Sequence, residues 1–294
     1  MNEERRLDPV SLRADLVALA WHQWAALGVT GWTTEETVPV DPEALIVLTA
    51  HLGNADARLR ECATDWCLAF DSYVNETRLH SVAREVGLTD EARRFFATIK
   101  AVGGPLWVVS DAQPWIGYEN RQKVHLTRLN TPGRTVLALR AMLGVSARAD
   151  ILTALTGLSE PVTVSELAAR SRYTRKAVEL ALKPLALAGV VMLLRSGPRN
   201  TQVILAPDSI FSSWLLPGPA MPDWTSRITV ALRVLSLAEA ATSMPYPAFG
   251  VEARRLVREN RLAMIAAGLR LPSESLVGDA FTAAFSEWAH SGFR

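Results

Sequence analysis

The chain of 294 residues is longer than one typical domain, so we expect two or three packed units. Hydrophobic residues make up 49% and charged residues 21%, a globular balance, and no apolar run reaches the roughly 20 residues that a membrane span needs. A formal net charge of +1 argues against a chain that binds nucleic acid along its whole length.

The N-terminus and the cysteines both indicate a reducing compartment. The N-terminal segment mixes acids and bases and lacks the apolar centre and cleavage site of a signal peptide, so we expect a cytoplasmic protein. Cys62 and Cys67 have a spacing that matches neither a disulfide framework nor a usual zinc motif. We therefore expect reduced core thiols, no metal ion and no cofactor.

Residues 1–104 are predicted to form a helical N-terminal domain. Apolar residues recur near a 3.6-residue period from Leu12 to Leu27, and Asp41 followed by Pro42 is typical of a helix start. Further helices are expected over residues 59–70, 77–86 and 90–102. The stretch 77–104 has the rhythm of a degenerate winged helix without a basic recognition helix, which favours a packing role.

The next segments are a structured linker, residues 105–130, and a central domain, residues 131–216. Helical periodicity resumes at residue 135 and continues to residue 158. The proline-rich segment 217–222 then indicates a boundary, after which residues 217–294 are predicted to form a helical C-terminal domain for dimer or partner contacts. Its expected helices cover residues 224–238, 251–267 and 277–288.

Charge is distributed unevenly along the chain. Residues 131–207 contain ten basic and four acidic side chains, a local charge of +6, which leaves −5 for the rest. A basic segment between acidic flanks is typical of a chain in which one part meets phosphate and the others meet protein.

The most specific pattern covers residues 162–207, VTVSELAARSRYTRKAVELALKPLALAGVVMLLRSGPRNTQVILAP. Thr163 or Ser165 can cap a short helix, and Thr174 can cap the next one. The inner stripe of that second helix would be Val178, Ala181, Leu182 and Leu185. Gly189 is placed to end it, and two β-rich runs around residues 195–200 predict a hairpin with a basic tip.

This pattern resembles winged helix-turn-helix regulators of the arsenic-repressor and multiple-antibiotic-resistance-repressor type. The resemblance implies a mainly α protein whose helix beginning at Thr174 enters the major groove of double-stranded DNA. Base contacts would come from Arg172, Tyr173, Arg175 and Lys176, with Thr174 beside them. Phosphate contacts would come from Lys183, Arg195 and Arg199, with Asn200 also on the wing. Pro184 departs from the pattern and should bend the end of the helix.

The outer regions are similar, more loosely, to bacterial regulators that combine a helical N-terminal region, a central winged helix and a helical tail. The residues that carry this second resemblance are Ala253, Arg254, Leu256, Ala267, Gly268, Leu269, Gly278, Phe281 and Trp288. We expect a homodimer through the flanking helices and a near-palindromic operator. Some such regulators lie beside toxin-like partners, so a toxin-like protein partner is a further expectation.

Two other interpretations compete with the DNA-binding regulator. A protein-interaction adaptor or antitoxin-like protein would use the same winged helix to dock a partner. An enzyme ranks third, because no glycine-rich cofactor motif follows Pro207 and the P-loop, HExxH and GxSxG motifs are absent. The tryptophans Trp21, Trp24, Trp32 and Trp66 could line a ligand pocket, but large aromatic residues mostly supply core.

Overall fold

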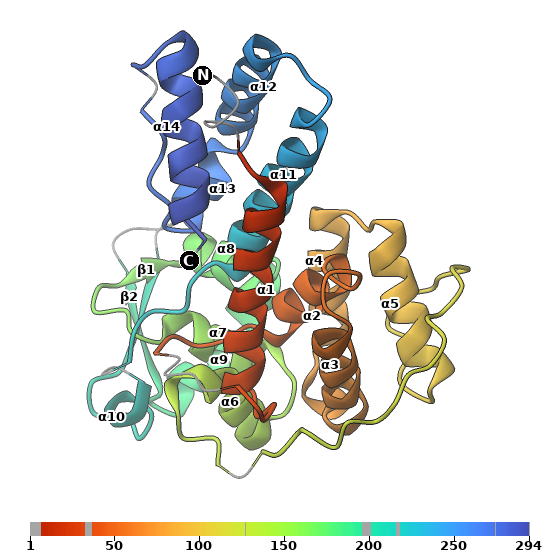
Figure 1. The fold of residues 1–294 in the computed structure, drawn as a ribbon. Helices are drawn as coiled ribbons and strands as arrows, with labels where there is room; N and C mark the ends of the chain where they lie inside the picture. Colours follow the sequence, from red (N-terminus) through yellow and green to blue (C-terminus); the bar gives the residue numbers. More distant parts are fainter. Residues whose placement is uncertain are drawn as a thin grey trace.

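The computed structural model describes residues 7–32, 37–126, 128–195, 201–215, 218–273 and 275–293. The described chain is mainly helical and contains a small antiparallel sheet (Figure 1). The N-terminal helices are α1 (Pro9–Ala26), α2 (Pro42–His51), α3 (Ala57–Ala69), α4 (Glu76–Val86) and α5 (Asp90–Ala101). The expected helix start at Asp41 is confirmed, because its side chain accepts a hydrogen bond from the Ala44 amide at 3.1 Å.

The C-terminal helices complete the core of the N-terminal ones. They are α11 (Trp224–Ala241), α12 (Tyr246–Glu259), α13 (Arg261–Ala266) and α14 (Gly278–Ser291). Helix α1 packs against α2, α11 and α14, and one continuous hydrophobic cluster joins the two ends of the chain (Figure 1). The outer regions, which sequence reasoning divides into two domains, therefore share one core.

One predicted C-terminal helix, residues 251–267, is two helices in the structure. Helix α12 ends at Glu259 and α13 begins at Arg261. A polar side chain at the junction explains the break, because the side-chain amide of Asn260 donates to the Leu256 carbonyl at 2.8 Å while its oxygen accepts from Arg233.

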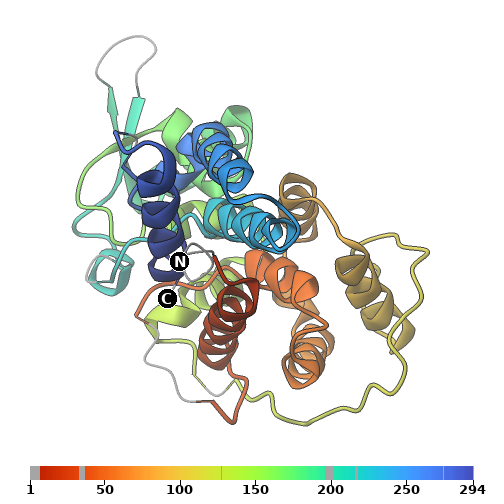
Figure 2. The ribbon, with the colours of Figure 1, turned by 45° about the horizontal axis from the view of Figure 1, so that its top comes forward.

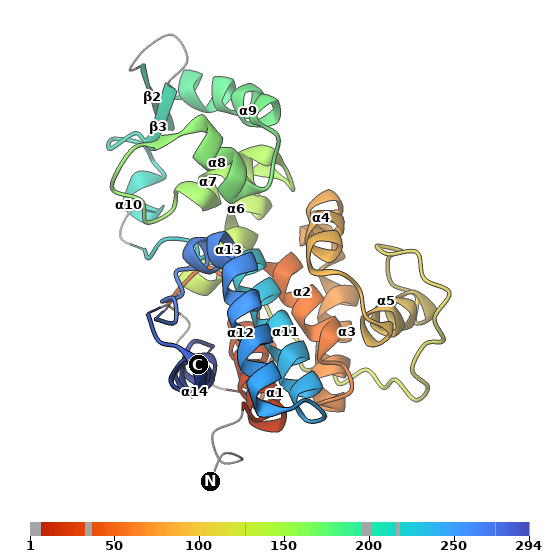
Figure 3. The same ribbon diagram turned by 90° about the horizontal axis from the view of Figure 1, so that it is seen from above.

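Residues 135–215 form a unit with its own core, here called the central module. It contains α6 (Thr135–Leu143), α7 (Ala147–Leu155), β1 (Val162–Thr163), α8 (Val164–Ser171), α9 (Arg175–Leu187), β2 (Val191–Arg195), β3 (Thr201–Leu205) and α10 (Ser212–Leu215). The strands are antiparallel in the order β1-β3-β2, and Leu193 lies opposite Val203. In Figure 3 the β2–β3 hairpin and α9 lie at one end of the molecule, away from α1, α12 and α14.

The segment expected to be a structured linker, residues 105–130, is irregular over its described residues. It contains neither helix nor strand there, apart from a β-bridge between Val124 and Val29, and it runs around the outside of the body from α5 to α6 (Figure 2). Short 3-10 turns lie at Asp71–Tyr73 and Pro132–Arg134. The strands in the described ranges all lie between Val162 and Leu205, so α4 and α5 have no hairpin of their own. None of the described helices has the length and apolar character to cross a membrane.

Candidate nucleic-acid interface

The start of α8 is set by its own residues. The Glu166 amide donates to Thr163 Oγ1 at 3.2 Å, and the Thr163 amide donates to the Glu166 carboxylate at 2.7 Å. The Thr163 hydroxyl also donates to this carboxylate, at 2.9 Å, and the two bonds from Thr163 to the carboxylate hold the pKa of Glu166 below its usual range. The reciprocal pair is a capping box, which settles the choice between Thr163 and Ser165 in favour of Thr163.

Helix α9 begins at the predicted position and buries the predicted stripe. The Ala177 amide donates to the hydroxyl of Thr174, which is the N-cap, at 3.3 Å. All four stripe residues are buried: Val178, Ala181, Leu182 and Leu185. Pro184 lies inside the helix, which continues to Leu187, and Gly189 follows the helix end with a φ of +69°. One face of α9 is therefore committed to the core and the opposite face is free.

The free face of α9 carries three exposed cations. Arg175, Lys176 and Lys183 are all exposed, and the guanidinium of Arg175 pairs with Glu179 one turn later at 2.9 Å. Arg195, the last residue of β2, is exposed as well. Arg199 and Asn200, also expected at the interface, lie outside the described residues.

Arg172 is turned into the molecule. It adopts a left-handed backbone conformation, with a φ of +61°, at the end of α8. Its guanidinium contacts Glu85 of α4 at 2.7 Å and Asp223, the N-cap of α11, at 2.8 Å. Burial alone would lower the pKa of Arg172, but the two carboxylates raise it above its ordinary value. This side chain joins the central module to the outer helices, so in this structure it is not free to contact a base.

Tyr173 is also used internally. Its hydroxyl donates to Asp150 at 2.9 Å and accepts from the side-chain amide of Asn75, the N-cap of α4, at 2.7 Å. Burial and the Asp150 carboxylate raise the pKa of Tyr173, so the phenol stays protonated. The hydroxyl of this half-buried side chain is therefore engaged inside the molecule and not in the base contact expected for it.

Behind Tyr173 lies a buried ionic network that sequence reasoning missed. Arg140 of α6 donates to Glu43 at 2.6 Å and to Asp150 at 2.9 Å, and all three side chains are almost fully buried. Arg78 of α4 adds bonds to Glu43, at 3.2 Å, and to the Ser171 carbonyl, at 3.0 Å, and it also pairs with Asp41. The network connects α2, α4, α6 and α7 to the turn between α8 and α9.

The two acids that α2 and its cap supply to this network end with opposite pKa shifts, although burial acts on both in the same direction. It raises the pKa of Glu43, and Arg140 offsets that effect only in part. It would also raise the pKa of Asp41, but Arg78 and the Ala44 amide outweigh it and hold that pKa below its usual range. The local excess of positive charge in residues 131–207 is thus partly internal, because Arg140 and Arg172 are neutralised by acids that include residues of the outer helices.

The aromatic and sulfur residues of the outer core behave as packing groups. Trp21, Trp24 and Trp66 are buried, and Trp32, which is 41% exposed, stacks on Trp21. The cysteines are buried and unbonded, as expected. Within the described ranges, no group of three or more His, Cys, Asp and Glu side chains is arranged to hold a metal ion.

Comparisons of this chain with protein-family models, with curated proteins and with solved structures found no match.

Proposed function

We propose that this protein is a sequence-specific DNA-binding transcriptional regulator that performs no chemistry. In this proposal α8, the turn at Arg172 and α9 form a helix-turn-helix, β2 and β3 form the wing, and α9 enters the major groove. The observation that carries the proposal is the free face of α9, where exposed cations stand on a helix whose opposite face is anchored in a core.

The positions of these cations favour an anionic partner. Arg175 and Lys176 occupy the first turn of α9, the positive end of the helix dipole, where cations gain nothing from the helix itself. Lys183 lies two turns later on the same side as Lys176. All three cations would have a partner if Arg175 and Lys176 contacted base pairs and Lys183 bound a phosphate.

The first test is binding of the protein to its own upstream DNA and to a scrambled duplex, measured over a range of salt concentrations. We expect specific binding that weakens steeply with salt. The variant Arg175→Ala/Lys176→Ala should lose the preference for the specific duplex. The matched control is Arg93→Ala/Lys100→Ala, which removes the same charges from the exposed side of α5 and should bind as the unmodified protein does.

Single variants separate the two kinds of contact. Arg175→Ala should lower discrimination between duplexes by about 1–3 kcal/mol. Lys183→Ala should weaken binding to all duplexes alike and reduce the slope of log Kd against log salt by about one unit. Equal behaviour of the two variants would refute this division, and no binding to either duplex would refute the regulator.

We also propose that the protein acts as a homodimer through its outer helices, which would place two copies of α9 about one turn of DNA apart. Exposed apolar side chains on α12 and α13 support this arrangement: Val251, Leu262 and Ile265. Sedimentation of the free protein and of its DNA complex tests it. A monomer in both conditions would contradict the dimer without contradicting DNA binding.

A second candidate function, the protein-interaction adaptor, is favoured by a different observation. Apolar side chains are exposed on α9 and on β2, which is an edge strand: Leu180, Leu187, Met192, Leu193 and Leu194. Leu187 alone is 91% exposed. An adaptor, including one for a toxin-like partner, would form a complex of fixed stoichiometry that Leu187→Asp disrupts, and it would show no salt-sensitive DNA binding.

A further inference from the structure

An exposed leucine lies in the middle of the free face of α9. Leu180 is 56% exposed and lies outside the described core of the central module. That core already holds α9 through the opposite stripe, from Val178 to Leu185. Leu180 therefore contributes little to the packing of α9, because an apolar side chain stabilises a fold in proportion to the area that it removes from water.

Helical spacing places two lysines beside this leucine. Lys176 lies one turn before Leu180 and Lys183 lies three residues after it, so the three side chains are neighbours on one side of the helix, and all are exposed. At a rise of about 1.5 Å per residue, Leu180 lies about 6 Å beyond Lys176 along the helix axis. Among the described residues neither lysine forms an ion pair, and Glu179, the adjacent acid, pairs with Arg175.

A leucine between two lysines favours DNA over a protein as the molecule that covers it. The buried centres of protein interfaces are depleted of lysine, because each ammonium group must give up its water. A protein that covered Leu180 would have to desolvate Lys176 and Lys183 or supply each with an acid. In a major groove, by contrast, both lysines reach phosphates or base acceptors while the side chain between them faces the base edges.

The chemistry of the major groove then selects the base that suits a leucine. Most of the groups that base pairs present there are hydrogen-bond donors and acceptors, and the C5 methyl group of thymine is the apolar exception. A leucine placed against a ring nitrogen, a carbonyl or an amino group would take that group out of water without giving it a hydrogen bond, which is unfavourable. Against a methyl group, both surfaces gain from leaving water.

We propose that Leu180 is a specificity-determining residue that contacts the methyl group of a thymine in the bound DNA. The thymine lies within about two base pairs of the base contacted by Lys176, since about 6 Å separates the two residues along α9 and base pairs are about 3.4 Å apart. This inference rests on the proposed DNA-binding function. It adds an apolar contact to a face for which the sequence indicates only polar and basic ones.

Replacement of thymine by deoxyuridine tests the contact, because it removes the methyl group and keeps every hydrogen-bonding group of the base. The thymines of the specific upstream duplex are replaced one at a time, and the Kd of the full-length protein is measured for each duplex. We expect the affinity to fall about fourfold at one position, or at one position in each half-site. That factor corresponds to the loss of one buried group of methylene size.

The variant Leu180→Ala connects the methyl group to its contact on the protein. The side chain is exposed and alanine favours a helix, so we expect the variant to fold normally. It should bind the thymine duplex more weakly and no longer distinguish it from the deoxyuridine duplex. The matched control is Leu106→Ala, which makes the same substitution at a side chain of the linker that is 47% exposed and should keep the fourfold difference.

The possible failures are distinguishable. If the protein binds its duplex specifically but no replacement of thymine changes the affinity, the role of Leu180 is overturned and the regulator stands. The same conclusion follows if the fourfold difference persists in Leu180→Ala. If no duplex is bound specifically, with thymine or with deoxyuridine, the regulator and the role of Leu180 both fail.

Discussion

Replacing Arg140 with methionine should destabilise the protein in a pH-dependent way. Its guanidinium lies between Glu43 and Asp150, at 2.6 and 2.9 Å, and it also donates to the Tyr73 carbonyl at 2.7 Å. Methionine fills much of the same space but leaves two buried carboxylates without their shared cation. Glu43 keeps its bond from Arg78, and Asp150 keeps its bond from Tyr173.

The expected loss of unfolding free energy is set by the least costly way to neutralise the unpaired buried carboxylate, which is to protonate it. Protonating one carboxyl of ordinary pKa near 4.3 at pH 7 costs about 3.7 kcal/mol, since each pH unit is worth about 1.36 kcal/mol. Glu43 is the group that would take up the proton, because burial already raises its pKa. This value agrees with the loss of about 3–5 kcal/mol that is usual when one partner of a buried ion pair is removed.

The pH dependence identifies the mechanism. In the variant, one buried carboxyl holds a proton in the folded state, whereas in the unfolded state the same carboxyl has lost its proton at any pH above its ordinary pKa. The contribution of this group to the stability of the variant therefore rises as the pH falls. The difference in unfolding free energy between Arg140→Met and the unmodified protein should therefore shrink by about 2 kcal/mol from pH 7 to pH 5.5. Urea denaturation followed by circular dichroism at both pH values measures it.

The control is Arg255→Met, which makes the same substitution in a side chain that is 57% exposed and pairs with Glu252 at 3.0 Å. Exposed pairs contribute about 0–1 kcal/mol, so this variant should lose little stability at either pH. A loss below about 1 kcal/mol for Arg140→Met, or a loss that does not change with pH, would refute this account of the network.

Other changes test single features of the fold. Burial lowers the pKa of His51 to about 4, so between pH 7.5 and pH 5 the unfolded state takes up a proton that the folded state does not, and the unfolding free energy should fall by about 2 kcal/mol. The same denaturation series on His51→Gln should lack this fall. Burial raises the pKa of Cys62 to about 11 and that of Cys67 further, so neither thiol should react with DTNB at pH 8 until the protein is unfolded; rapid reaction of the native protein would contradict their packing. Gly157→Ala should lower the unfolding free energy by at least about 2 kcal/mol, because a Cβ there would lie 2.3 Å from the Ala220 amide nitrogen. Gly189 has the same φ of +69° but open space around the position of a Cβ, so Gly189→Ala should lower it by only about 1 kcal/mol. Thermal denaturation of the two variants compares them.

The helices were predictable because their signals are local. Asp41, Thr163 and Thr174 bond to amides three residues away, so a cap can be recognised without knowledge of the fold. The buried stripe of α9 is equally local, because its 3.6-residue period already separates two faces. The same holds for Gly189, whose place after an apolar helix indicates its left-handed conformation.

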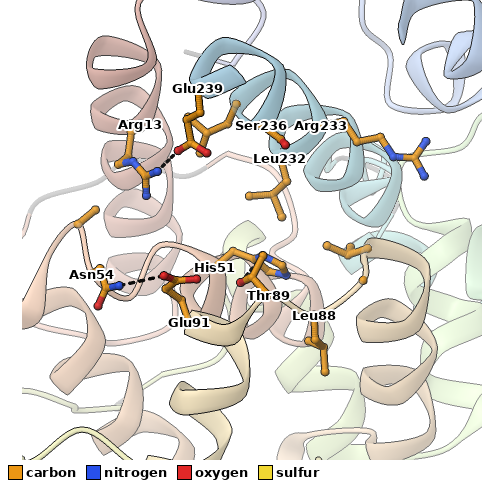
Figure 4. Close-up of a pocket in the computed structure, with 14 residues that line it drawn as sticks. Arg13, His51, Asn54, Leu88, Thr89, Glu91, Leu232, Arg233, Ser236 and Glu239 are labelled. Carbon is orange, nitrogen blue, oxygen red and sulfur yellow. Dashed lines mark hydrogen bonds and ion pairs between the residues drawn. The ribbon is translucent and has the colours of Figure 1, made fainter. Parts of the chain in front are cut away.

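The direction of a charged side chain at a turn was not predictable. The partners of Arg172 lie 87 residues before it and 51 residues after it, in segments assigned from sequence to separate domains. Asp150 gave no signal either, since its partners Arg140 and Tyr173 meet it only when α6, α7 and the α8–α9 turn pack together. Nothing in the sequence distinguishes His51 from the other histidines, because the cleft that it lines is formed with residues of α1, the α4–α5 turn and α11, which are far apart in the chain (Figure 4).

The four polar and basic residues from Arg172 to Lys176 that flank the cap Thr174 divide into two pairs by what the fold gains from them. Arg172 and Tyr173 satisfy acids of other helices, so burial and ion pairing account for their chemistry fully. Arg175 and Lys176 lie at the positive end of α9, and among the described residues Arg175 pairs with Glu179, an exposed acid of its own helix. Within the described part of the chain this second pair contributes little to the stability of the fold, and a negatively charged ligand would give both cations a partner. In the proposed complex with DNA, Arg175 and Lys176 are therefore the two residues of this turn that remain to contact bases. A variant at either of them should abolish recognition without disturbing the contacts that hold the central module in place.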